Sequence, residues 1–127
     1  MNLALLLHTQ GKDGEAELLY RDALASAERS FGKNNWQVGV GRMGLGQTLV
    51  SLNRFTEAEA VLLEAERVLA TAEGVPAAHH KKCVEGLVAL YSKWNQSEPG
   101  KGYDAKAELW KAKLPTTQPA ATPTSRP

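Results

Sequence analysis

The residues best suited to bind a metal stand together in the segment HHKKC at positions 79–83. His79 and Cys83 are four residues apart, so on a helix they would share one face, as two ligands of a zinc ion could. A closed zinc site needs further ligands, and Lys81 and Lys82 add positive charge beside this pair. We therefore expect no metal. We predict instead that the two histidines face solvent at the start of a helix and that Cys83 packs as a small apolar residue.

Two pairs of glutamates have the residue type for acid–base catalysis. Glu15 and Glu17, like Glu57 and Glu59, flank an alanine. Residues two apart on a helix point to different faces, so neither pair can act as a facing acid and base. Acidic residues in a first turn instead complement the helix dipole. No histidine stands at a spacing that suggests a nucleophilic triad, and we expect a protein that is not an enzyme.

Four glycines, at positions 39, 41, 44 and 46 in GVGRMGLGQ, superficially resemble a phosphate-binding loop. Their spacing fits neither nucleotide-binding fingerprint, and no strand is predicted before them. The alternative is a helix that packs closely against its neighbours, at some cost in helix propensity. We therefore expect no cofactor here, and this stretch could form the least stable helix of the chain.

The elements that position these residues come from a repeated unit. The segment TQGKDGEAELLYRDALASAE begins at residue 9. A similar segment, SLNRFTEAEAVLLEAERVLA, begins at residue 51, an offset of 42 residues. Gly11 becomes Asn53, and both residue types tolerate the left-handed backbone that ends a helix. A further offset of 42 aligns Gly44 with Gly86. Each unit is therefore predicted to be helix, short turn, helix, longer turn.

The periodicity within each unit predicts helices. Apolar residues from Gly14 to Phe31 follow three- and four-residue steps and form one face. The segment 55–72 follows the same steps, and small residues on these two faces, such as Ala16 and Ala58, let two helix axes approach closely, as an antiparallel hairpin requires. No run alternates with a period of two, so strands are not expected. We predict helices at 2–10, 13–31, 35–52, 55–73, 77–95 and 103–114.

The composition changes after Leu114. The last segment, PTTQPAATPTSRP, has four prolines in 13 residues and no large apolar residue. Such a segment buries too little apolar surface to offset the conformational entropy that it would lose on ordering. We predict one helical repeat domain at 1–114 and a disordered, Pro/Thr-rich tail at 115–127.

The repeated unit resembles the tetratricopeptide repeat, in the 42-residue form found in kinesin light chains and many bacterial proteins. QGKDGEAELLYRDAL at 10–24 matches the pattern QGKYxEAExLYxRAL, and LNRFTEAEAVLLEAE at 52–66 aligns with it more weakly. The resemblance covers about 2–114 and implies an all-α, right-handed superhelical solenoid of about 2.5–3 helix-turn-helix repeats. It implies packing roles for Leu3, Ala4, Leu7, Ala16, Tyr20, Ala23, Leu45, Gly46, Leu49, Ala58, Leu62 and Ala65.

The last unit is similar to the final repeat of the arrays that follow the kinase domain in large bacterial serine/threonine kinases. The segment LVALYSKWNQSEPGKGYDAKAELWKAKLP carries this similarity. No kinase motif stands in the chain itself: it has no Gly-rich phosphate loop, His-Arg-Asp loop or Asp-Phe-Gly. The residues shared with the closing pattern are Leu90, Tyr91, Trp94, Lys106, Ala107, Trp110 and Leu114.

The family resemblance implies a noncatalytic protein–protein interaction module that binds a peptide or protein segment on its concave face, along the first helix of each unit. The cluster of Lys, Asn and Arg that clamps a C-terminal carboxylate in chaperone-binding members is missing, so that ligand is not expected. The alternative for each groove position is an exposed surface residue that binds no ligand. The family's groove positions carry over to Leu5, His8, Thr9, Val40, Met43, Gln47, Val50, Ser51, Lys82, Glu85, Ala89, Ser92 and Lys93.

Charge and hydropathy narrow the partner and the compartment. The 15 basic and 14 acidic residues nearly cancel and leave no electrostatic footprint for nucleic acid or an anionic membrane surface. No apolar run approaches the roughly 18 residues of a spanning helix, and the first residues make no convincing signal peptide. One cysteine fits a reducing compartment. We expect a cytoplasmic, bacterial protein with a protein partner.

The first unit is shorter than the others. Met1 aligns with Met43, so the first helix lacks about two turns that its equivalents possess. Terminal repeats normally carry a polar outer surface, whereas LALLL at 3–7 is apolar. We expect either a fragment of a longer array or a chain that covers the Leu3–Leu7 edge with a second copy. Two further alternatives stay open: a C-terminal regulatory or scaffolding part of a bacterial serine/threonine kinase, and a structural oligomerisation unit.

Overall fold

The computed structural model describes residues 3, 6–7 and 10–114, and this part of the chain is helical with no strand. Residues 3, 6 and 7 have helical backbone. The bounds of the predicted helix at 2–10 lie outside the described residues. Those of the other five are close to the observed ones, and the largest difference is at the last helix, which ends at residue 111 and not at 114. The predicted tail at 115–127 lies outside the described residues. The helices are α2 (Asp13–Phe31), α3 (Trp36–Ser51), α4 (Phe55–Thr71), α5 (Ala77–Ser97) and α6 (Tyr103–Lys111).

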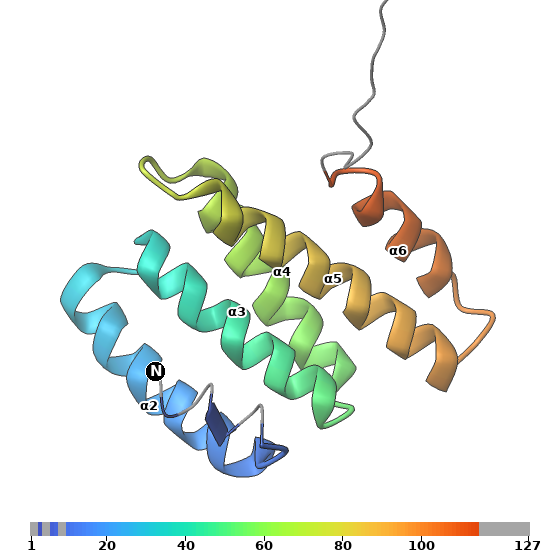
Figure 1. Ribbon diagram of the computed structural model, residues 1–127, viewed down its shortest axis with the longest axis horizontal. Coiled ribbons are helices and arrows are strands. Elements are labelled where there is room, and N and C mark those ends of the chain that lie inside the picture. The colour runs from blue at the N-terminus through green and yellow to red at the C-terminus, as the bar shows by residue number, and fades with distance from the viewer. Residues whose placement is uncertain (1–2, 4–5, 8–9, 115–127) are drawn as a thin grey trace, which may run out of the picture.

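Successive helices pack against one another as a row of hairpins (Figure 1). The helix α3 contacts α2 on one side and α4 on the other, and α5 in turn contacts α4 and α6. A further contact joins α3 to α5, the first helices of two successive units, which lie side by side. The predicted all-α helical-repeat class is confirmed.

The core lies between the helices and is built from the small and apolar residues that the repeat pattern singled out. Ala16, Ala58 and Ala65 are fully buried at the helix interfaces, which lets the helix axes approach closely. Leu3 is an exception: its side chain is 57% exposed, so its implied packing role is wrong, because no described element covers it. The implied packing residues that are buried are Ala16, Tyr20, Leu45, Gly46, Leu49, Ala58, Leu62 and Ala65.

The short turns of the first two units have the same geometry. Gly11 and Asn53 both have positive φ angles, 79° and 62°. After each of them a backbone N–H reaches back five residues: Lys12 N donates to the Leu7 oxygen at 2.7 Å, and Arg54 N donates to the Leu49 oxygen at 2.9 Å. This is the hydrogen bond of a left-handed helix end. The predicted equivalence of the two turns is therefore confirmed.

Two glycines of α3 place bare backbone against large side chains of the neighbouring helices. A Cβ atom at Gly44 would lie 2.5 Å from Tyr20 Cε1, and one at Gly46 would lie 2.5 Å from Leu62 Cγ. Both separations are far below the roughly 3.5–4.0 Å at which carbon atoms pack. The helix α3 therefore approaches α2 and α4 at a distance that only glycine permits, which confirms the predicted close packing.

Gly44 and Gly86, which are equivalent in the repeat, should respond to alanine in opposite directions, and Gly46 should behave like Gly44. We expect Gly44→Ala and Gly46→Ala each to lower the free energy of unfolding by about 1–3 kcal/mol, because the new methyl overpacks the contact. Gly86→Ala should raise it by about 0.5–1 kcal/mol. A Cβ at Gly86 would meet Gln47 and Leu62 atoms at 3.5–3.8 Å, which is ordinary contact. Urea denaturation measures all three; equal stability of Gly44→Ala and the parent would contradict this packing analysis.

Candidate functional site

The predicted groove residues on α3 and α5 meet at one cleft between these two helices. A cavity of about 480 Å³ opens there, and six of its seven lining residues are predicted groove positions. The seventh, Gly86, was missed; it stands four residues after Lys82 and three before Ala89, two predicted groove positions, so helix geometry could have placed it on their face. We call this cleft the α3–α5 groove, and it is lined by Gln47, Val50, Ser51, Lys82, Glu85, Gly86 and Ala89.

The other predicted groove positions lie elsewhere. Met43 is only 7% exposed and belongs to the core, and Val40 packs against that core. Ser92 and Lys93 are exposed on α5 without lining the cavity. The remaining three predictions, Leu5, His8 and Thr9, lie outside the described residues.

The α3–α5 groove combines a small, partly apolar floor with charged edges. Gln47 lies over Gly86, where a Cβ would be 3.5 Å from the Gln47 Nε2 atom. Lys82 and Glu85 are exposed, whereas Val50 is almost buried. Such a lining offers contacts to both apolar and polar groups of a ligand.

Lys93 ties α5 to the last turn of α3. Its Nζ atom donates to the Val50 carbonyl oxygen at 3.4 Å. This places the ammonium group beside a residue that lines the groove. The groove therefore has lysine side chains in it and next to it, both from α5.

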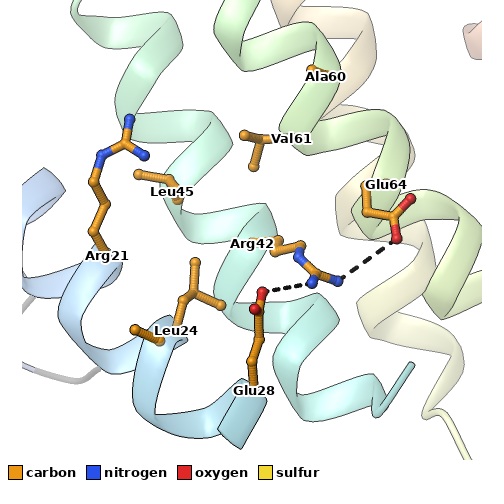
Figure 2. Close-up of a pocket in the computed structure, with 9 residues that line it drawn as sticks. Arg21, Leu24, Glu28, Arg42, Leu45, Ala60, Val61 and Glu64 are labelled. Atoms are coloured by element: carbon orange, nitrogen blue, oxygen red, sulfur yellow. Dashed lines mark hydrogen bonds and ion pairs between the residues drawn. The ribbon is translucent and has the colours of Figure 1, made fainter. Parts of the chain in front are cut away.

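A second cavity, of about 420 Å³, lies between α2 and α4 and is floored by α3 (Figure 2). Arg42 crosses it from α3 and is only 8% exposed. Its Nη2 donates to Glu28 Oε2 at 2.7 Å and its Nη1 to the Lys33 carbonyl oxygen at 3.0 Å, with Glu64 Oε2 at 3.9 Å. Because a buried guanidinium must be paired, these contacts have a structural cause. Sequence analysis missed this pairing, although Arg42 is the one charged residue within GVGRMGLGQ.

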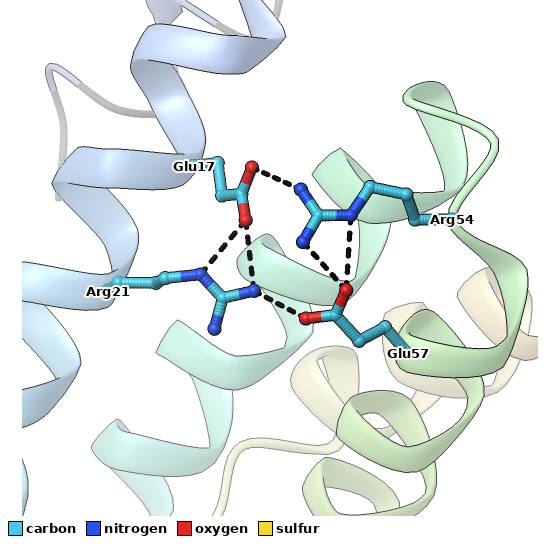
Figure 3. Close-up of polar contacts among 4 residues, drawn as sticks. All are labelled: Glu17, Arg21, Arg54 and Glu57. Atoms are coloured by element: carbon cyan, nitrogen blue, oxygen red, sulfur yellow. Dashed lines mark hydrogen bonds and ion pairs between the residues drawn. The ribbon is translucent and has the colours of Figure 1, made fainter.

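Four charged residues join α2 to α4 in a closed network (Figure 3). Arg21 Nη2 contacts Glu57 at 2.7 Å, and Arg54 Nη1 contacts Glu17 at 2.6 Å, while each arginine also bonds the other glutamate. A hydrogen bond from Arg54, and a smaller effect of the one from Arg21, hold the pKa of the Glu57 carboxyl below its ordinary value. The exposed position of Arg21, Arg54 and Glu57 keeps each pair weak. Glu57 lies in a first helical turn as predicted, but Glu17 is a link between two units.

Glu59 serves the last hairpin. Tyr91 donates its hydroxyl hydrogen to Glu59 Oε2 at 2.7 Å, and Lys106 Nζ lies 3.7 Å from the same oxygen. Burial and this carboxylate raise the pKa of Tyr91. Glu59 thus links α4 to both α5 and α6.

The HHKKC segment is packed against neighbouring helices. The Cys83 side chain is fully buried and its thiol donates to the Leu62 carbonyl oxygen at 3.7 Å, so its predicted packing is confirmed. The histidines are half-buried and not solvent-facing, because His79 lies against the Trp36 ring and His80 Nε2 is 3.1 Å from Glu66 Oε2. Across residues 3, 6–7 and 10–114, no three His, Cys, Asp or Glu residues gather as metal ligands would.

Comparison with known protein families gives one match. The family model of the tetratricopeptide repeat matches residues 1–37, so this part of the chain is similar to a tetratricopeptide repeat. Repeats of this family generally mediate protein–protein interactions and are typically noncatalytic. No curated protein and no solved structure matches the chain significantly. None of the helices described above has the length and apolarity needed to cross a membrane.

Alkaline pH should weaken the fold through Cys83. Burial, with a contribution from Glu66, raises the pKa of the thiol from 9.0 to about 12. The folded chain keeps this proton where the unfolded chain loses it, so the stabilisation is fully present below pH 9.0 and is lost as pH rises to about 12. We expect the urea midpoint to fall through this window.

The variant Cys83→Ala tests the assignment, because it removes the thiol and should make the alkaline decline shallower. Tyr20 and Tyr91, whose pKa values are also raised by burial, supply a residual decline in both proteins. An identical pH slope in Cys83→Ala and in the parent would show that the thiol does not contribute.

Proposed function

We propose that this protein is a noncatalytic interaction module that binds an extended segment of a protein partner in the α3–α5 groove. One observation carries the proposal: six residues chosen as groove positions from the sequence line a single cavity of about 480 Å³. Ligand clefts in proteins commonly have volumes of roughly 300–1,000 Å³. The groove therefore has a size suited to several residues of a bound segment.

The shape and chemistry of the lining favour a peptide. Gly86 and Ala89 have little or no side chain, so a peptide backbone can approach α5 closely. Gln47 and Ser51 carry hydrogen-bonding groups that match those of a peptide unit. A segment bound in this way would be recognised through its backbone and a few side chains, as in other peptide-binding grooves.

The surroundings of the reactive residue types support a noncatalytic function. Cys83 is buried and its raised pKa keeps the thiol protonated at neutral pH, which removes its nucleophilic form. Glu17, Glu28 and Glu57 are bonded to arginines, and Glu59 to Tyr91. Each of these contacts joins one helix to another or closes a turn, which is a structural use.

The resemblance of the last hairpin to repeats of bacterial kinases has a sufficient explanation in packing. Leu90, Tyr91, Trp94 and Ala107, which carry much of that resemblance, are all buried. Residues that hold a hairpin together would recur in any protein that uses it. We therefore prefer the interaction module to a kinase-linked regulatory part, and a kinase reading frame directly upstream of Met1 would reverse this preference. The cytoplasmic and bacterial setting stays a prediction.

The groove is tested by filling it. We expect peptides selected from a displayed random twelve-residue library to bind Ala89→Gln about tenfold more weakly than the parent, because the longer side chain occupies the cavity. Ala70→Gln, at an exposed position of α4, is the matched control and should bind like the parent. Circular dichroism establishes equal helicity of the three proteins. Peptides that bind all three equally, or the absence of any enriched peptide, would contradict the proposal.

Self-association is a second candidate, favoured by the exposure of two leucines in the first unit. Leu3 is 57% and Leu6 51% exposed, and apolar side chains left in water favour association with another surface. A second copy of the chain would cover the Leu3–Leu7 edge in this arrangement. Its function would be oligomerisation through that edge.

Light scattering of the parent and of a variant with Leu3→Glu and Leu6→Glu tests this candidate. We expect the parent to have the mass of a dimer and the variant that of a monomer, because two buried carboxylates would oppose the contact. A monomeric parent would rule out self-association through this edge at the concentration measured.

A further inference from the structure

We infer that the segment bound in the α3–α5 groove is acidic, with two carboxylate side chains that flank small uncharged residues. The inference rests on the proposed function, since it assigns a chemical class to the ligand of the same groove. It follows from the charges along α5, from their spacing and from the polar group between them.

Positive charge predominates along the groove. Lys82 lines the groove, and Lys93 lies next to it, beside Val50 of α3. Glu85 is the one acidic residue of the lining. The lining residues of α3 are uncharged. Within the described part of the chain, neither lysine lies within 4.0 Å of a carboxylate, unlike the arginines on the α2–α4 side. Two ammonium groups outside any ion pair, beside the uncharged lining of α3, attract and orient carboxylates.

The spacing of the two lysines matches a short extended segment. Lys82 and Lys93 are eleven residues apart, close to three helical turns, so they lie on the same side of α5 about 16 Å apart along its axis. An extended chain covers this distance in about five residues. Carboxylates about four to six residues apart could therefore reach both ammonium groups, since lysine side chains are long and flexible.

The middle of the groove suits an uncharged stretch of backbone. The Gln47 side chain lies over Gly86, and within the described residues its amide makes no hydrogen bond. A primary amide has both donor and acceptor atoms and can pair with the C=O and N–H of a peptide unit. Glu85, one helical turn along α5 from Lys82, would repel a carboxylate placed between the two lysines. The preferred order is therefore acidic, uncharged, acidic.

Selection from the random twelve-residue library also tests this inference. We expect the peptides enriched on the parent to contain more Asp and Glu than the starting library, with two acidic residues about four to six positions apart. The affinity of an enriched peptide should fall about tenfold in the double variant Lys82→Gln, Lys93→Gln. It should rise in Glu85→Gln, because the repulsion is removed.

The double variant Lys33→Gln, Lys111→Gln is the matched control: it makes the same change in net charge at exposed positions outside the groove, and its affinity should equal that of the parent. Peptides that lose affinity in Ala89→Gln but show no acidic enrichment, or no loss in the Lys82, Lys93 variant, would overturn the inference and leave the proposed function standing. Binding insensitive to Ala89→Gln would overturn both. Tight binding of a short single-stranded oligonucleotide would also overturn it, since phosphates would then be the preferred anions.

Discussion

The arrangement of the helices depends on the approach of α3 to both of its hairpin neighbours. Gly44 and Gly46 leave the space that Tyr20 of α2 and Leu62 of α4 fill, and a single methyl group at either position would collide with them. Because α3 is so closely embedded, it can contact α2, α4 and α5 at once. The low helix propensity of its glycines is the cost of that position, and tertiary packing offsets it. The face of α3 turned toward α5 lines the α3–α5 groove, and its Arg42 and Leu45 line the cavity between α2 and α4.

The two cavities beside α3 differ in how their charges are satisfied. Between α2 and α4, Arg42 is bonded to Glu28, and the Glu17, Arg21, Arg54 and Glu57 network closes on itself. Beside the groove, the described structure gives Lys82 and Glu85 no ion pair, and Lys93 only a 3.4 Å hydrogen bond to the Val50 carbonyl oxygen. Charges that are already paired gain little from a ligand, whereas unpaired ones can gain a new contact without breaking an old one. This difference, and not cavity size, is the reason to propose the groove as the binding surface.

Much of the fold was predictable because the repeat is local. Helix bounds and turn geometry can be predicted without knowledge of tertiary structure. They follow from the period of 42 residues, from apolar residues at three- and four-residue steps, and from glycine or asparagine at helix ends. The predicted groove positions came from the resemblance to the tetratricopeptide repeat. The Arg42–Glu28 pair, the Tyr91–Glu59 hydrogen bond and the half-burial of His80 were not predictable, because each joins residues from different helices and leaves no periodic trace. The end of α6 was also missed, since apolar residues continue past Lys111.

The hairpin of α5 and α6 holds in place the helix that carries Lys82 and Lys93. The helix α5 continues to Ser97, and Trp94 stacks on Tyr103 of α6, with ring centroids 4.0 Å apart, and on Phe55 of α4 at 5.8 Å. Trp94 is next to Lys93, as the buried Cys83 is next to Lys82. Each lysine is therefore beside an anchored residue, and the distance between their Cα atoms is set by a rigid helix. A rigid spacing of two charges discriminates among ligands by the spacing of their own charges, which is how a short groove can be selective.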